Sequence, residues 1–160
     1  MEFLLRLKSW QLFAIIILPL MVSSFWLDQL LYGIGYVVYI GWMYSIGIKM
    51  HSLFSFQSKP KVIYFKISCL SALLIVIITT FFDPLQNGPS FAFWIESVVI
   101  VCSMFYILNF AARMLESVIQ GKIIGFSDSL KAFFGFWFFP FGIWYIQPVV
   151  KIVLEKHETL

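Results

Sequence analysis

Charged residues are scarce in this sequence, and their scarcity argues against a soluble fold. Asp, Glu, Lys and Arg make up 12% of the 160 residues, whereas soluble domains average about 25%. Hydrophobic residues make up 61%, and a chain of this length cannot bury so much apolar surface in one core. Linkers rich in Ser, Pro or Gly are also missing. We therefore expect an all-α membrane protein, with residues 1–160 forming a single helical domain solvated largely by lipid.

Histidine and cysteine are almost as scarce, which argues against several kinds of chemistry. Cys69 and Cys102 have no CxxC or Cys/His setting, and His51 and His157 are not at metal-ligand spacing. The sequence also lacks a GxSxG motif and a phosphate-cradling glycine loop. We therefore expect no metal, no cofactor and no enzymatic activity. Because the basic residues are scattered, we expect no nucleic-acid partner either.

Four apolar runs reach the length of about 20 residues that crosses a bilayer. They cover residues 10–27, 30–48, 62–82 and 91–112. Although Arg6 and Lys8 ahead of the first run are also typical of a secretory signal, we expect this segment to remain as a span. The fourth run has no Gly or Pro before Gly121, so its helix should continue to Gln120 and project beyond the membrane.

The basic residues predict which way the spans face. The two loops that would lie on one side contain Asp28 and Asp83 but no Lys or Arg. The segments that would lie on the other side carry the basic residues. Because positive charge accumulates on the cytoplasmic side, we expect a multi-pass protein of a bacterial inner membrane with both termini in the cytoplasm.

Residues 132–150 differ from the other apolar runs. Aromatic side chains dominate this segment, and two glycines and two prolines interrupt it. Aromatic residues prefer the membrane boundary, and helix breakers disfavour a straight span. A fifth crossing would also carry Lys151 and Lys156 to the outside. We therefore favour a re-entrant or interfacial element, with a fifth span as the alternative.

Part of this segment resembles a known kind of protein. The string WFFPFGIWYIQP at Trp137–Pro148 is similar to a block near the end of small bacterial polytopic membrane proteins. In those proteins a Phe-Ser-Asp segment, like Phe126–Asp128 here, often precedes the block. The resemblance covers only the C-terminal part of the chain. It implies a bacterial inner membrane and no known activity.

Glu96 is the most informative polar residue, because an ionisable group inside the membrane marks a site or a polar partner. It lies about 7–8 Å inside the outer end of the fourth helix, at 1.5 Å per residue from Phe91. Polar side chains of other helices reach the same depth and predict an outer-leaflet pocket for a ligand or ion. Its residues are Glu96, Tyr32, Tyr36, Thr79 and Thr80, with Ser23 and Ser24 at the same level. The plainer interpretation is a hydrogen bond from Tyr or Thr to Glu96 that locks the bundle.

Two further patterns suggest contacts with partners. On the inner half of the fourth helix, polar residues recur at helical spacing. They are Asn109, Arg113, Glu116 and Gln120. They mark either a helix end entering the cytoplasm or a docking face for a partner protein or anionic lipid. In the second run, Gly41 and Ser45 form a small-xxx-small step that allows close helix packing, within one chain or between chains. We expect a homo-oligomer.

Three functions fit these observations. The first is a non-enzymatic inner-membrane subunit that anchors or senses for a cytoplasmic partner, in a bacterial defence or envelope system. The second is a homo-oligomeric channel with Glu96 at an outer vestibule, although no run has the regular polar stripe of a pore. The third is a lipid-modifying enzyme with Glu96 as general base, although no companion acid, metal site or nucleophile accompanies it.

Overall fold

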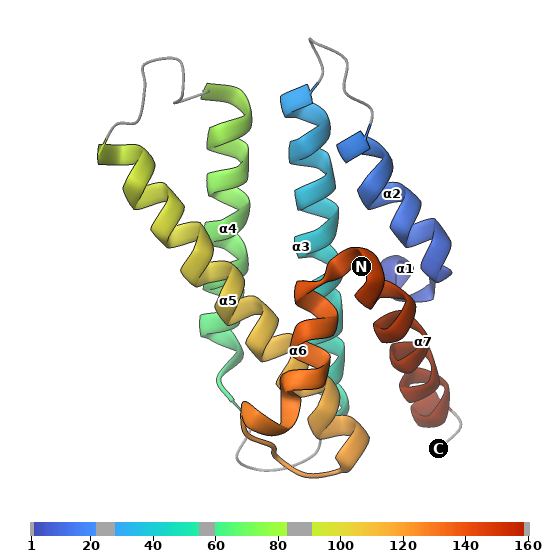
Figure 1. Ribbon diagram of the computed structural model, residues 1–160. Coiled ribbons are helices and arrows are strands. Elements are labelled where there is room, and N and C mark those ends of the chain that lie inside the picture. Colours follow the sequence, from blue (N-terminus) through green and yellow to red (C-terminus); the bar gives the residue numbers. More distant parts are fainter. Residues whose placement is uncertain (1, 22–27, 55–59, 83–90, 159–160) are drawn as a thin grey trace.

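The structure, a computed structural model, describes residues 2–21, 28–54, 60–82 and 91–158 (Figure 1). Within these ranges every regular element is a helix, so the all-α expectation is confirmed. The elements are α1 (Glu2–Arg6), α2 (Ser9–Met21), α3 (Asp28–Leu53), α4 (Val62–Phe82), α5 (Phe91–Gln120), the short 3-10 helix η2 (Ser127–Ser129), α6 (Leu130–Trp137) and α7 (Phe139–Glu158).

Among the described residues, three helices, α3, α4 and α5, are long and apolar enough to cross a bilayer. Helix α4 coincides with the predicted run, and α5 ends at Gln120 before Gly121, whose φ of 64° suits a helix C-cap. Helix α3 extends past residue 48, because Lys49 and His51 lower the hydropathy without breaking the helix. The described part of the first predicted span is the 13-residue helix α2, and residues 22–27 lie outside the described residues. The chain is an all-α membrane protein.

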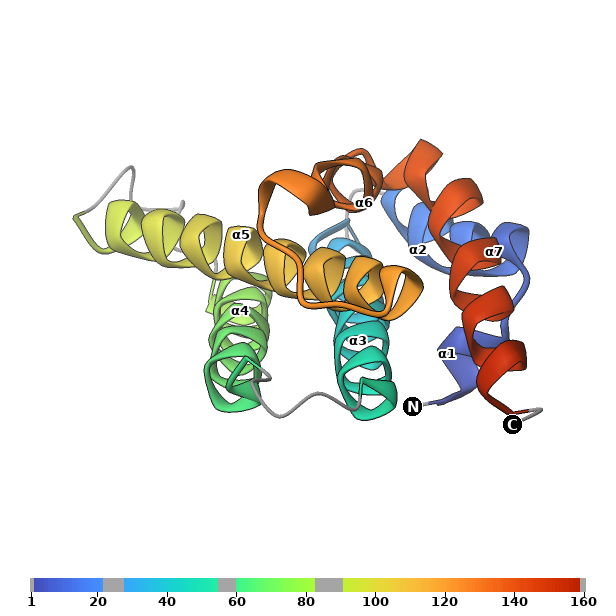
Figure 2. The ribbon, with the colours of Figure 1, turned by 90° about the horizontal axis from the view of Figure 1, so that it is seen from below.

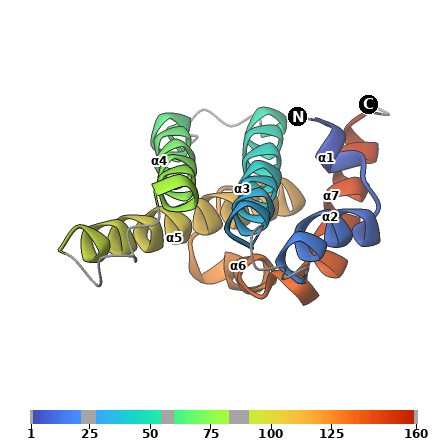
Figure 3. The same ribbon diagram turned by 90° about the horizontal axis from the view of Figure 1, so that it is seen from above.

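Helix α3 is the centre of the bundle. It packs against α1 and α2 on one side and against α4 and α5 on the other (Figures 2 and 3). Trp42, Met43 and Ile46 are fully buried in this core. Because α3 contacts helices on several sides, its sequence is apolar all round and has no single apolar stripe.

Two glycines bring α3 close to α4. A Cβ atom on Gly33 would lie 2.6 Å from Oγ1 of Thr80, and one on Gly47 would lie 2.5 Å from the ring of Phe65. At Gly41, where the sequence predicted close packing, the nearest atom would be 3.7 Å away. The small-residue pattern therefore identified the right helix but the wrong turns, because tertiary packing decides which small residue faces a neighbour.

Helices α6 and α7 form a re-entrant pair. They bend by 119° at Phe138, and Figure 1 shows α7 returning towards the end of the bundle where α6 begins. The N–H of Phe138 still donates to the Phe134 carbonyl at 2.8 Å, and the N–H of Gly142 donates to the Phe138 carbonyl at 2.8 Å. The Gly135 carbonyl fills the space where a Cβ on Gly142 would lie. The bend fits the expected re-entrant element and also its alternative, a single broken span, and the pair extends beyond residues 132–150 in both directions.

Gln147 ties α7 to the start of the chain. The residue is fully buried, and its Nε2 donates to the carbonyls of Leu4, Leu5 and Leu7 at 3.2, 2.9 and 2.9 Å. Its Oε1 accepts a hydrogen bond from Nε1 of Trp42 at 2.9 Å. The last carbonyls of a helix have no partner within that helix. Gln147 therefore satisfies the end of α1 and joins α1, α3 and α7 at one point.

We predict that Gln147→Leu destabilises the protein by about 3 kcal/mol, because it leaves several buried polar groups without partners and each costs about 1–3 kcal/mol. Gln120→Leu is the control, since Gln120 is exposed and exposed substitutions change stability by about 0.5 kcal/mol or less. Thermal unfolding in detergent measures both variants. Equal midpoints for the two would show that the Gln147 contacts do not hold the bundle together.

We predict that Gly142→Ala opens the α6–α7 pair, because the new Cβ would collide with the Gly135 carbonyl. The expected loss of stability is about 3 kcal/mol, at the upper end for overpacking. Gly125→Ala is the matched control, since no atom lies within 4 Å of a Cβ built there. The same unfolding assay compares them. A Gly142→Ala protein as stable as Gly125→Ala would contradict this packing.

Candidate functional site

A cavity of small-molecule size lies between α3, α4 and α5. Helix α5 is steeply inclined to the other two (Figures 1 and 3), and the space between them amounts to about 450 Å³. Small-molecule sites typically occupy about 300–1,000 Å³. The lining residues are Tyr32, Gly33, Tyr36, Val76, Thr79, Thr80, Ile100, Val101, Met104 and Trp137.

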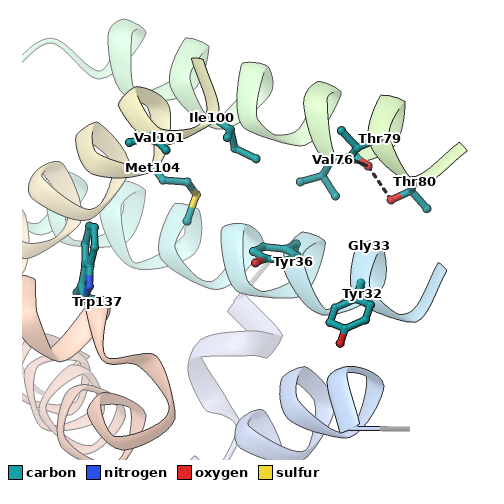
Figure 4. A pocket seen from close by; sticks show the side chains of 10 residues that line it. All are labelled: Tyr32, Gly33, Tyr36, Val76, Thr79, Thr80, Ile100, Val101, Met104 and Trp137. Atoms are coloured by element: carbon teal, nitrogen blue, oxygen red, sulfur yellow. Dashed lines mark hydrogen bonds between the residues drawn. The ribbon is translucent and has the colours of Figure 1, made fainter. Parts of the chain in front are cut away.

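The cavity walls combine apolar surface with hydroxyl groups (Figure 4). Val76, Ile100 and Met104 provide aliphatic and thioether contacts. Tyr32 and Tyr36 line the α3 side and are 47% exposed each, so the cavity opens to the surroundings of the bundle. A site of this composition suits an amphipathic molecule that arrives from the lipid.

The structure brings four of the five residues predicted for an outer pocket around this cavity. Tyr32, Tyr36, Thr79 and Thr80 all line it. Glu96 does not line the cavity. It lies on α5 one helical turn from Ile100, which is a lining residue. Ser23 and Ser24, expected at the same level, lie outside the described residues. Whether these residues bind a ligand remains a prediction.

Among the described residues, the hydroxyls of Thr79 and Thr80 do not donate to Glu96, contrary to the interpretation of a hydrogen-bonded lock. Oγ1 of Thr79 donates to the carbonyls of Ile75 and Val76 at 3.0 and 3.1 Å, and Oγ1 of Thr80 donates to Val76 at 2.7 Å. Threonine hydroxyls in helices often bond to the preceding turn in this way. Oε2 of Glu96 is buried and has no hydrogen-bond partner in the part of the chain that the structure describes.

The predicted inner face of α5 is divided between buried and exposed side chains. Nε of Arg113 donates to the Ile124 carbonyl at 3.2 Å, so Arg113 holds the segment after α5. Oδ1 of Asn109 is buried and has no hydrogen-bond partner within the described ranges; Asn109 and Arg113 line a cavity of about 40 Å³. Glu116 is half-buried and Gln120 is exposed. The four residues therefore do not form one continuous exposed surface.

Sequence reasoning missed two residues that shape the site. Trp137 of α6 lines the inner end of the cavity, because the re-entrant pair returns into the bundle (Figure 4). Gln147 holds that pair in place. The available signal was a lone glutamine in an aromatic, apolar helix, since such a side chain needs buried partners. Within the described ranges, no three His, Cys, Asp or Glu side chains gather where they could hold a metal ion.

Comparisons with known proteins add no family. No family model matches the chain, and no curated protein or solved structure is similar to it at a significant level. The resemblance of Trp137–Pro148 to a bacterial membrane-protein block therefore stays a prediction. What the chain does must be inferred from its geometry.

Proposed function

We propose that the protein is a non-enzymatic membrane subunit that senses an amphipathic molecule in the bilayer on behalf of a cytoplasmic partner. The cavity between α3, α4 and α5 is the observation that supports this. It has the size of a small-molecule site and mostly apolar walls. Val101, on its α5 side, is 62% exposed, so the occupant can enter sideways from the lipid.

Helix α5 provides a route from the cavity to the other end of the molecule. Ile100 and Met104 line the cavity, and Asn109 to Gln120 follow on the same continuous helix. An occupant that favours one inclination of α5 would shift the population of that inclination. The inner end of α5, and the segment that Arg113 holds, would move with it and alter the surface offered to a partner.

We further propose a bacterial inner membrane as the location, with both termini in the cytoplasm. The C-terminal ends of α3, α5 and α7 all lie at one end of the bundle (Figure 1). Lys122 follows the end of α5, and Lys156 lies in the last turn of α7. Positive charge accumulates on the cytoplasmic side of membranes, which supports this orientation.

Labelling of single cysteines tests the orientation. In a background carrying Cys69→Ala and Cys102→Ala, a membrane-impermeant maleimide should label Asp83→Cys on intact spheroplasts. It should label Glu158→Cys only after the membrane is permeabilised, because the re-entrant pair returns α7 to the inner side. Labelling of Glu158→Cys from outside would overturn both the orientation and the placing of the pair.

A homo-oligomeric channel is the second candidate function. The unpartnered carboxylate oxygen of Glu96 favours it, because a ring of such groups could form a cation vestibule. The homo-oligomer itself stays a prediction. Ser45 is buried within the chain, whereas Gly41 is half-buried, so only Gly41 of the predicted Gly41–Ser45 step could face a second copy.

Filling the cavity tests the sensor proposal. We predict that Val101→Trp lowers the amount of lipid-derived ligand retained by the purified protein at least about tenfold, because the indole occupies the cavity between α3 and α5. Val98→Trp is the matched control, since Val98 lies on the same helix, is 60% exposed and does not line the cavity. Native mass spectrometry from nanodiscs of bacterial lipid extract provides the measurement. Equal retention by both variants would contradict the proposal.

A further inference from the structure

The cavity has the character of a site for a positively charged head group. No lysine, arginine or histidine is among its lining residues. Glu96 is the acidic residue nearest to it along α5, four residues and thus about 6 Å from Ile100. Residues four apart on a helix lie on nearly the same face. Glu96 is not itself a lining residue, but it follows the cavity by one helical turn toward the outer end of α5.

Glu96 has an unmet need for a hydrogen-bond donor. Its Oε2 is buried and has no partner among the described residues. A buried polar atom without a partner is rare and unfavourable, and an ionisable group in a membrane generally marks a site. A cationic donor from the lipid would satisfy this oxygen.

The hydroxyl groups of the cavity point to the same chemistry. Thr79 and Thr80 each donate their single hydroxyl proton to carbonyls of α4. Each hydroxyl oxygen can then only accept a further hydrogen bond. A carboxylate is likewise only an acceptor. A ligand bearing N–H donors matches these groups, whereas a phosphate or a sulfate, which has only acceptor oxygens, does not.

Aromatic rings add a second attraction for cations. Tyr32 and Tyr36 line the α3 side of the cavity, and Trp137 lines its inner end (Figure 4). The faces of such rings attract ammonium groups by about 0.5–2 kcal/mol, most strongly where water is excluded. The remaining walls, including Val76 and Met104, suit an aliphatic chain.

We propose that the cavity binds a long-chain aliphatic amine in its protonated form. The ammonium group pairs with Glu96 and donates to the threonine oxygens, and the chain lies among the apolar residues of α4 and α5. This inference rests on the proposed ligand-sensing function and names the ligand class of the same cavity.

Binding of matched amphiphiles to the full chain in nanodiscs of zwitterionic lipid tests the proposal. The probes are dodecylamine, dodecanol and dodecyl sulfate, which share one chain length and differ in head-group charge, and protein-free nanodiscs correct for partitioning. We expect wild-type protein to bind dodecylamine saturably and at least about tenfold more tightly than either other probe, an effect of about 1.4 kcal/mol or more. Equal or tighter binding of dodecanol would overturn the amine assignment without any variant being needed.

Substitution of Glu96 tests the residue that carries the proposal. Glu96→Gln keeps the shape and removes the charge, so it should weaken dodecylamine binding about tenfold while leaving dodecanol binding unchanged. Asp128→Asn is the charge-matched control. Asp128 is exposed in η2 and does not line the cavity, so this substitution should leave both affinities unchanged. Unaltered dodecylamine binding by Glu96→Gln would overturn the role of Glu96.

The same measurements separate this inference from the function on which it rests. If Val101→Trp removes the binding of all probes but Glu96→Gln changes none, the cavity is a ligand site and the role given to Glu96 is wrong. If no probe binds saturably and lipid retention is equal in Val101→Trp and Val98→Trp, the ligand-sensing function is wrong as well.

Discussion

Within a membrane, backbone N–H and C=O groups have no water to bond with, so every break in a helix must be satisfied by the protein itself. Among the described residues, this constraint is visible at the break between α1 and α2 and at the break between α6 and α7. Gln147 supplies donors to the carbonyls left by α1. At the second break, the hydroxyl of Tyr39 donates to the Phe136 carbonyl at 2.7 Å. Each break is thus closed by a side chain from a distant part of the sequence.

These two contacts also place the candidate site. Tyr39 lies on α3 and Phe136 lies on α6, next to Trp137 at the inner end of the cavity. Gln147 fixes α7 against α1 and α3. The hydrogen bond from Tyr39 to the Phe136 carbonyl therefore positions the wall that α6 contributes to the cavity. The inclination of α5 positions the wall that α5 contributes.

Apolar length and charge placement were sufficient to predict much of the fold. The limits of α4 and α5, and the glycine that ends α5, follow from local composition. The reversal between α6 and α7 follows from glycines and prolines within an aromatic run. Local rules suffice for these features because lipid leaves the backbone little alternative to helix.

Other features depend on contacts that local rules cannot supply. The sequence placed Thr79 and Thr80 at the right depth, but their hydroxyls bond to their own helix and not to Glu96. Small residues recur along α3, yet packing against α4 selects Gly33 and Gly47. Trp137 reaches the cavity only because a helix far along the chain folds back. In each case the outcome depends on which helices become neighbours.

The contact between Gln147 and the carbonyls of Leu4, Leu5 and Leu7 has a consequence for biosynthesis. A chain is made from its amino terminus, and these contacts join residues at least 140 positions apart. Helix α1 therefore lacks these partners until α7 has been translated. Formation of α3, α4 and α5 precedes closure, and the arrival of α7 completes the assembly. Contacts of such long sequence separation slow folding, so the synthesis of α7 sets the earliest time at which the end of α1 is satisfied.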